Sequence, residues 1–244
     1  DLKKIMSFLP ADHQTLLFSA TMPNSISQLA KKILKNPETI ALSISKPAAG
    51  VKQEVFLAFD EQKVKLLCHI LKDRKDYDSI IIFTSAKVKV NEIVRSLGRN
   101  KLPASGISSD LKQDAREEVL RGFRSKRIRI LVATDVMSRG IDIKEINMVV
   151  NYDVPHEAAD YVHRVGRTAR ANTKGEAITF VTPNDMFRLR KIEKLIEASI
   201  PKSQPPESIG AGPEWNENSV KPSNKHKFQN KKKGYQGNKP RNKS

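Results

Sequence analysis

Short apolar runs alternate with amphipathic segments from Val51 onward, and this alternation constrains the fold more than any other feature of the sequence. Ile80 to Phe83 is apolar throughout, as in a strand of a sheet that is buried on both faces. The spacing predicts strands over 55–59, 80–83, 103–107, 128–133, 148–152 and 177–181 and helices over 60–71, 88–97, 111–123, 157–163 and 186–198. We therefore expect an α/β fold, in which a parallel sheet carries helices on both faces.

The residues before Val51 have a separate pattern. A short strand is expected over 14–18 and a helix over 24–35, before Pro37. Residues 43–50 contain Ser, Pro, Ala and Gly with little to bury, which is typical of a linker. Because the chain does not begin with Met, we expect a fragment of a longer protein.

The charge is strongly positive, with 44 Lys and Arg against 27 Asp and Glu, a net charge of +17. Residues 221–244 contain eight Lys, Arg241 and no acidic residue. We expect 201–244 to be a disordered basic tail, because so few of its residues could be buried. Its sign favours a polyanion such as nucleic acid; a tail that only keeps the protein soluble is the alternative.

Composition also bears on membrane insertion and on the redox compartment. No apolar run approaches the roughly 20 residues that span a bilayer, so we expect no membrane partner. Cys68 is the single cysteine and cannot form an internal disulfide, which fits a reducing cytoplasm.

Four strings of polar and small residues stand at or just beyond expected strand ends, the edge at which parallel sheets collect ligands. A weaker string, Gln113-Asp114-Ala115-Arg116, lies near the start of a helix. The four strings are Ser19-Ala20-Thr21, Phe83-Thr84-Ser85, Ala133-Thr134-Asp135 with Arg139-Gly140-Ile141-Asp142, and His163-Arg164-Val165-Gly166-Arg167-Thr168-Ala169-Arg170. In this order they resemble the motifs of the DEAD-box ATP-dependent RNA helicases of superfamily 2. The tail and the Gln-x-Ala-Arg string are similar to the bacterial RhlE-like subgroup.

The resemblance implies a domain organisation. Residues 51–200 would be the second RecA-like domain, and 1–42 the C-terminal remnant of the first, ATP-binding RecA-like domain. The sequence contains no GxxxxGK[ST] string and no Asp-Glu-Ala-Asp string. ATP and Mg²⁺ would therefore be bound mainly by a missing N-terminal domain, and we expect no metal ligand in this chain.

The arginines of the last motif lie at i, i+3 and i+6, and at helical spacing Arg167 and Arg170 would point the same way. Two guanidiniums suit a phosphate, and arginines placed there stabilise phosphoryl transfer. The resemblance implies that these two are the catalytic arginine fingers and that His163 couples the motif to its neighbours. For nucleotide binding it implies Asp142 and Arg139.

Phe83 has two readings of equal weight. It either packs in the core or places its ring against a guanidinium of the last motif, a cation–π contact that would fix the direction of the arginine finger. On the second reading we count Phe83 among the nucleotide-binding residues. Asp135 likewise is either functional or satisfies buried backbone groups.

For RNA, the resemblance implies backbone contacts without sequence preference from four residues: Thr134, Gly140, Gln113 and Arg116. It also implies that Ser19 and Thr21 couple hydrolysis to the closure of the two domains.

The function implied is ATP hydrolysis coupled to local unwinding of RNA duplexes, with this chain inactive alone. Two alternatives stay open, a non-enzymatic RNA-binding or chaperone module and a superfamily 2 DNA translocase.

Overall fold

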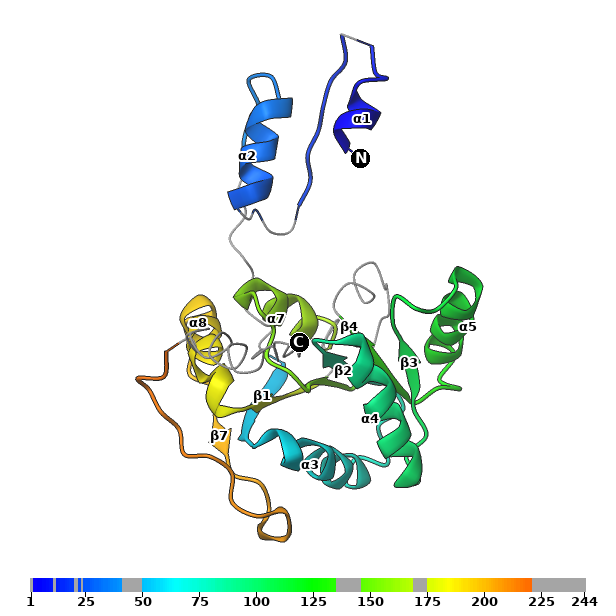
Figure 1. The fold of residues 1–244 in the computed structure, drawn as a ribbon, viewed down its shortest axis with the longest axis vertical. Coiled ribbons are helices and arrows are strands. Elements are labelled where there is room, and N and C mark those ends of the chain that lie inside the picture. The colour runs from blue at the N-terminus through cyan, green and yellow to red at the C-terminus, as the bar shows by residue number, and fades with distance from the viewer. Residues whose placement is uncertain are drawn as a thin grey trace, which may run out of the picture.

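The computed structural model of the chain describes residues 2–10, 12–19, 22, 24–40, 50–134, 146–168 and 175–220, and for 2, 3, 24 and 25 the backbone alone. Its centre is a seven-stranded parallel sheet with the strand order β3-β4-β2-β5-β6-β1-β7 (Figure 1). The strands are β1 (Val51–Leu57), β2 (Ile80–Thr84), β3 (Ser105–Ile107), β4 (Ile130–Thr134), β5 (Met148–Asn151), β6 (Gly175–Val181) and β7 (Lys202–Ser203). The predicted parallel α/β sheet is confirmed.

Helices connect the strands and cover both faces of the sheet. They are α3 (Asp60–Lys72), α4 (Lys87–Arg99), α5 (Gln113–Arg124), α7 (Ala158–Val165) and α8 (Met186–Ile196), with single 3₁₀ turns at η1 (Pro183–Asp185) and η2 (Glu207–Ile209). Two further helices, α1 (Leu2–Met6) and α2 (Asn24–Ile33), precede the sheet. None of the helices in the described part of the chain has the length and apolar character that a membrane span requires.

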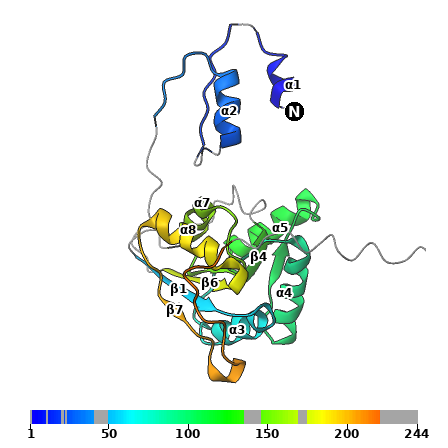
Figure 2. The same ribbon diagram turned by 60° about the vertical axis from the view of Figure 1, so that its left-hand side comes forward.

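The strand β2 shows why the sheet is buried on both sides. Ile80 and Ile82 belong to the core cluster beneath α3 and α4, whereas Ile81 and Phe83 belong to the cluster beneath α5. A third cluster packs α7 and α8 against β1 and β6, on the side of the sheet opposite α3 (Figures 1 and 2). Successive side chains of a strand point to opposite faces, so an unbroken apolar run is what a sheet covered on both faces requires.

The segment with α1 and α2 lies apart from the sheet in both views (Figures 1 and 2). Its large apolar side chains are exposed: Ile5, Phe8, Leu9, Leu16, Phe18, Met22, Ile26 and Ile40. The helix predicted over 24–35 is confirmed as α2. The strand predicted over 14–18 is wrong, because a strand needs a hydrogen-bonded neighbour and no described segment pairs with these residues.

Residues 201–220 are not the disordered start of a tail, so the expected boundary at residue 200 is wrong. The strand β7 pairs with β1 and extends the sheet, with Phe56 beside Ser203. Trp215 packs against the cluster under α8, and the Nζ of Lys202 lies 4.6 Å from the centre of its ring. We call residues 201–220 the strap. The few apolar residues and prolines of the strap are enough for it to pair with the edge of the sheet. Residues 43–49 of the expected linker and 221–244 of the expected tail lie outside the described residues.

Candidate functional site

Polar side chains gather where β2, β4 and β5 end. Thr84 ends β2, Thr134 ends β4 directly beside it in the register, and Asp153 follows β5 by two residues. Thr84 and Asp153 are buried, and Thr134 is half-buried. Since the carboxyl ends of parallel strands share one edge, this is the edge at which such sheets bind ligands.

The carboxylate of Asp153 is the centre of this polar cluster. Its Oδ2 accepts hydrogen bonds from the Thr84 hydroxyl at 2.8 Å and from both the backbone N–H and the hydroxyl of Ser85 at 2.9 Å. Its Oδ1 lies 2.9 Å from the Nζ of Lys89 on α4 and 3.3 Å from the Nζ of Lys63 on α3. The two ammonium groups also lie 6.0 and 5.4 Å from the centre of the Tyr152 ring. One side chain therefore joins two strand ends and two helices.

Burial alone would raise the pKa of Asp153. The Ser85 N–H, the two lysines and the Thr84 hydroxyl outweigh burial, and together they hold the pKa of this carboxyl far below its usual range. The same pairing with Asp153 outweighs the burial of the Lys89 ammonium and raises the pKa of Lys89. The surrounding donors and cations therefore favour the ionised form of Asp153. Two buried or half-buried cations next to a buried anion satisfy the general rule that charges inside proteins are paired.

Arg164, on α7, adds a third cation next to this cluster. Its side chain is 3% exposed. One guanidinium nitrogen donates hydrogen bonds to the Asn151 side-chain oxygen at 2.9 Å and to the backbone carbonyl of Asp153 at 3.0 Å. The guanidinium carbon lies 5.0 Å from the centre of the Phe83 ring. The predicted contact between Phe83 and a guanidinium of the last motif is confirmed, and α7 is thereby attached to the ends of β2 and β5.

Phe83 itself is 1% exposed. Both readings of this residue therefore hold at once, because the ring is part of the core and also touches Arg164.

The helical spacing assumed for the last arginines is wrong beyond Arg164. The helix α7 ends at Val165, and Gly166 forms its C-cap. Thr168 then bridges to Ile146 ahead of β5, and its hydroxyl donates to the Ile146 carbonyl. Arg167 consequently lies in a turn after the helix and is half-buried. His163 lies in the last turn of α7, 35% exposed, with its Nδ1 3.9 Å from Asp160.

The predicted RNA contacts lie on two neighbouring elements of the same edge. Thr134 is the last residue of β4, and Gln113 and Arg116 are in the first turn of α5. The Gln113 amide donates to the Glu117 carboxylate at 2.8 Å. Ser19, in the N-terminal segment, is exposed. The remaining predicted residues lie outside the described part of the chain: Thr21, Asp135, Arg139, Gly140, Asp142 and Arg170.

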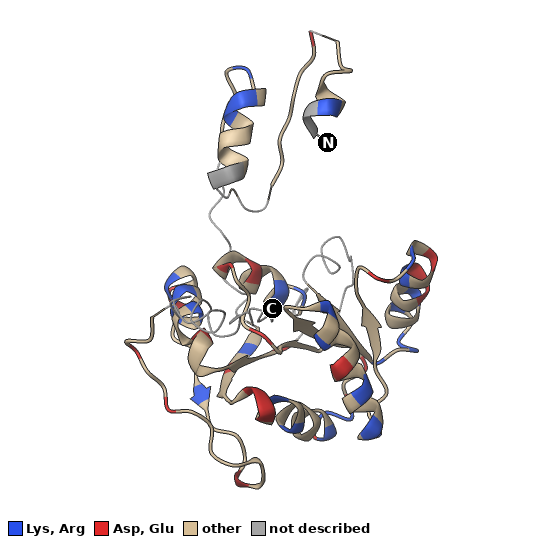
Figure 3. Cartoon of the chain, viewed as in Figure 1, with Lys and Arg blue, Asp and Glu red and all other residues tan. Residues whose placement is uncertain are grey.

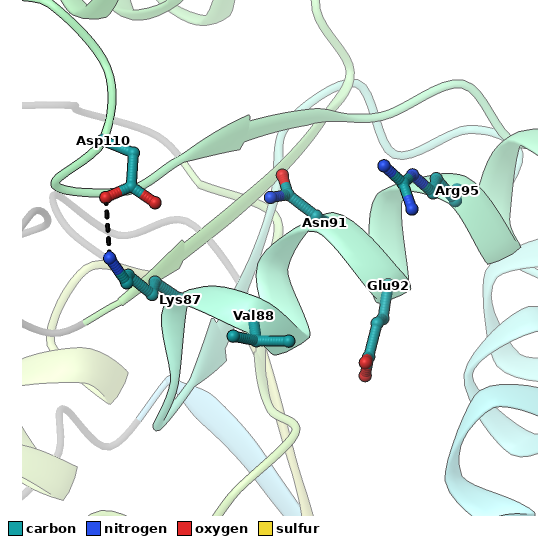
Figure 4. A pocket seen from close by; sticks show the side chains of 6 residues that line it. All are labelled: Lys87, Val88, Asn91, Glu92, Arg95 and Asp110. Carbon is teal, nitrogen blue, oxygen red and sulfur yellow. Dashed lines mark hydrogen bonds and ion pairs between the residues drawn. The ribbon is translucent and has the colours of Figure 1, made fainter.

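A shallow pocket of about 210 Å³ lies on this edge, at the start of α4. Figure 4 shows Lys87 and Asp110 facing each other across its mouth, with 2.9 Å between Nζ and Oδ1. Its walls carry Val88, Asn91, Glu92 and Arg95. Figure 3 places basic residues on α4, α5 and α8 as well, so the positive charge is spread over both faces of the sheet.

Sequence reasoning missed the Asp153 cluster. The available signal was position, since Asn151-Tyr152-Asp153 follows an apolar strand in the same way as the recognised strings follow theirs. The two lysines could not be recognised from the sequence, because Lys63 and Lys89 each resemble an ordinary charged residue of an amphipathic helix.

Comparison with known proteins agrees with this geometry. Residues 62–172 match the helicase conserved C-terminal domain. The DEAD-box ATP-dependent RNA helicase CshA of Geobacillus kaustophilus is 38% identical over 206 residues, which cover 84% of this chain and 44% of that protein. The chain thus spans less than half the length of this relative.

Two solved structures are similar to the fold described above. Saccharomyces cerevisiae Dbp5, bound to RNA and ADP BeF3, aligns with a TM-score of 0.73 at 33% identity, over 82% of this chain and 54% of that one. Escherichia coli DEAD-box protein SrmB, bound to the regulator RraA, aligns with a TM-score of 0.60 at 32% identity, over 70% of this chain and 96% of that one.

These likenesses and the motif order define a RecA-like domain of a superfamily 2 helicase. The chain belongs to the DEAD-box family of ATP-dependent RNA helicases, and what it carries is that family's C-terminal helicase domain. Its assignment to the RhlE-like subgroup stays a prediction.

Proposed function

We propose that the chain supplies the C-terminal half of an ATP-dependent RNA helicase, which hydrolyses ATP to open short RNA duplexes locally. The observation that carries this proposal is the shared edge of the sheet. Arg164, the first arginine of the motif, and the strand end at Thr134 are joined there through Thr84 and Asp153. A nucleotide and an RNA strand bound at that edge would lie close enough to influence each other.

For the nucleotide, we propose that Arg167 and Arg170 act as arginine fingers and that Asp142 and Arg139 contact the rest of ATP. The donor set fits a polyphosphate, because guanidiniums match phosphate geometry and remain charged at all working pH values. His163, partly exposed on α7, would connect the motif to its neighbours. When bound, ATP and Mg²⁺ supply the reacting phosphate and its charge neutralisation, and we propose that they are held mainly by a preceding ATP-binding domain.

For RNA, we propose backbone contacts from Thr134, Gly140, Gln113 and Arg116. A threonine hydroxyl and the N-terminus of α5 are suited to phosphate oxygens, which carry no sequence information. Binding by this domain would then be independent of sequence. The RNA seen in the Dbp5 structure supports this choice of ligand.

We propose that residues 1–42 complete a preceding RecA-like domain. The exposure of eight large apolar side chains in the described part of this segment, among them Phe18 (88%) and Ile40 (83%), supports this, because so much exposed apolar surface ordinarily marks an interface. Ser19 and Thr21, in the same segment, would then couple hydrolysis to domain closure. We also place the protein in the cytoplasm, where its RNA substrates are.

The test is RNA-stimulated ATP hydrolysis by the complete protein that carries this chain. We expect the 244-residue chain alone to hydrolyse essentially no ATP. In the complete protein, Arg170→Ala should lower turnover by about 10³-fold while RNA binding is largely kept. Arg127→Ala, at an exposed arginine before β4, is the matched control and should leave turnover unchanged.

Matched RNA and DNA strands distinguish the alternatives. Equal stimulation by both would favour a DNA translocase, and duplex binding without any ATP turnover would favour an RNA-binding or chaperone module. Normal turnover in Arg170→Ala would contradict the finger assignment.

A further inference from the structure

We propose that Asp153 is a positioning residue that couples RNA contact at Thr134 to the arginine motif on α7. The inference rests on the proposed function and adds to it a specific link between the two ligands. It requires that Asp153 touch neither ligand and act only through the residues that it holds.

The link on the RNA side runs through β2. Thr84 is the register partner of Thr134, so the ends of β2 and β4 move together as parts of one hydrogen-bonded ladder. The Thr84 hydroxyl and the N–H of Ser85 both donate to Oδ2 of Asp153. A displacement of Thr134 by a bound phosphate is therefore transmitted to the Asp153 carboxylate through two short contacts.

The link on the nucleotide side runs through the backbone. The Asp153 carbonyl accepts a hydrogen bond from Arg164 at 3.0 Å, and the Phe83 ring, one residue before Thr84, contacts the same guanidinium. Arg164 is on α7, one turn before Arg167 and next to His163. The position of the Asp153 main chain thus fixes where α7 presents the motif.

The charge of Asp153 is what makes this junction rigid. Lys63 is 1% exposed and Lys89 is 37% exposed, and both ammonium groups lie on Oδ1. Replacing the carboxylate by an amide keeps the shape but removes the anion that the two lysines share. Lys89 then loses its carboxylate partner, and Lys63 keeps Asp60, whose Oδ1 lies 2.8 Å from its Nζ. The ladder end, α3 and α4 would then lose their common anchor, and the Asp153 main chain that accepts the Arg164 hydrogen bond would be held less firmly, whereas each element would keep its own apolar contacts.

The experiment compares turnover with and without RNA in the complete protein. The readout is the ratio of the two turnover rates at saturating ATP, because a purely structural defect lowers both rates alike. We expect Asp153→Asn to lower this ratio about tenfold, a size typical of coupling between sites. Single-stranded RNA affinity should stay within about threefold of the wild type, because Asp153 touches no RNA in this proposal.

Two controls match the variant. Asp78→Asn removes an exposed aspartate that pairs with Lys126 at 2.6 Å, next to the opposite end of β2, and should leave the ratio unchanged. Val150→Ala weakens β5 at a fully buried position of the apolar core beneath α3 and α4, and should lower stability without lowering the ratio.

Milder variants keep the test decisive if Asp153→Asn does not fold. Ser85→Ala removes one hydrogen bond to Asp153, and Lys89→Met removes the ion pair with Asp153 together with the contact to the Tyr152 ring. Both residues are partly or fully exposed, and each variant should lower the ratio by a smaller factor than Asp153→Asn. An unchanged ratio in these variants, or an equal loss in Val150→Ala, would overturn the inference. A wild-type protein that RNA does not stimulate would instead overturn the proposed function.

Discussion

Arg164 and Phe83 are both buried, and their guanidinium and ring lie 5.0 Å apart between α7 and the end of β2. A buried guanidinium is stable only where its N–H groups and its charge are satisfied. The ring, the Asn151 amide and the Asp153 carbonyl provide part of that environment. The contact therefore attaches α7 to the end of β2 and also contributes to the core.

Substitution of Phe83 should separate these two contributions. Phe83→Leu removes ring volume and the cation–π contact, whereas Phe123→Leu removes ring volume from the same cluster. We expect Phe123→Leu to lower the free energy of unfolding by about 1 kcal/mol and Phe83→Leu by about 0.5–2 kcal/mol more. Urea unfolding of the chain measures both. Equal losses would mean that the contact adds nothing to stability.

Acid should destabilise the domain through Asp153. Its pKa is lower in the folded state than in the unfolded chain, so the stabilisation is fully present above about pH 5. It is lost as the pH falls below the ordinary carboxyl pKa of about 4 toward the folded value. Glu176, whose pKa is also lowered, against its burial, by Arg74, contributes in the same direction.

Urea unfolding between pH 7 and pH 3 tests this expectation. The free energy of unfolding should fall by on the order of 2 kcal/mol more in the wild type than in Asp153→Asn over the acid range. Glu176→Gln should remove a further part of the slope. Identical pH profiles in wild type and Asp153→Asn would contradict the lowered pKa.

The strap depends on a glycine without room for a side chain. A Cβ atom on Gly212 would lie 1.9 Å from the Leu57 carbonyl oxygen, whereas one on Gly98 would meet no atom within 4 Å. We expect Gly212→Ala to release the strap and to lower the unfolding temperature, and Gly98→Ala, within α4, to raise stability by about 0.5–1 kcal/mol.

Trp215 reports on the strap directly because it is the only tryptophan of the chain. Its fluorescence should shift toward that of a solvent-exposed indole in Gly212→Ala and stay unchanged in Gly98→Ala. In the wild type the fluorescence and circular dichroism transitions in urea should coincide, as expected for one cooperative unit. A separate, earlier fluorescence transition would show that the strap undocks by itself.

The basic residues beyond the strap should affect RNA affinity through salt. Deleting 221–244 removes eight Lys and Arg241. For single strands each neutralised phosphate adds about 0.7 to the slope of log affinity against log salt, so the truncated complete protein should have a shallower slope. Fluorescence anisotropy with one RNA at several salt concentrations measures it. An unchanged slope would leave the tail a solubilising role.

The central sheet was predictable because it depends on local patterns. The apolar run at 80–83 required a strand buried on both faces, and the spacing over 111–123 required a helix with one apolar face. The Phe83 contact was predictable for a different reason, since a motif fixed both partners. Local patterns and motifs can both be recognised within short stretches of sequence, and for this reason both allowed a prediction.

The features that escaped prediction depend on distant partners. Asp153 is joined to Lys63 and Thr84, which lie far away in the sequence and have no shared motif. Residues 14–18 have a strand-like composition without a neighbouring strand in the described residues, and 201–220 have a tail-like composition with a sheet edge to bind. In both segments the structure depends on whether a neighbouring strand is available for pairing. Composition does not reveal whether such a strand is present.

The place of β1 in the sheet has a consequence for biosynthesis. This strand begins at Val51 and is the first of the sheet to leave the ribosome, but its two neighbours, β6 and β7, begin at Gly175 and Lys202. Ordering such distant partners carries a large loop-closure cost and slows folding. The nascent chain must therefore present both hydrogen-bonding edges of β1 until translation of the domain is nearly finished. We expect β2, β4 and β5 to assemble first and molecular chaperones to shield β1 meanwhile.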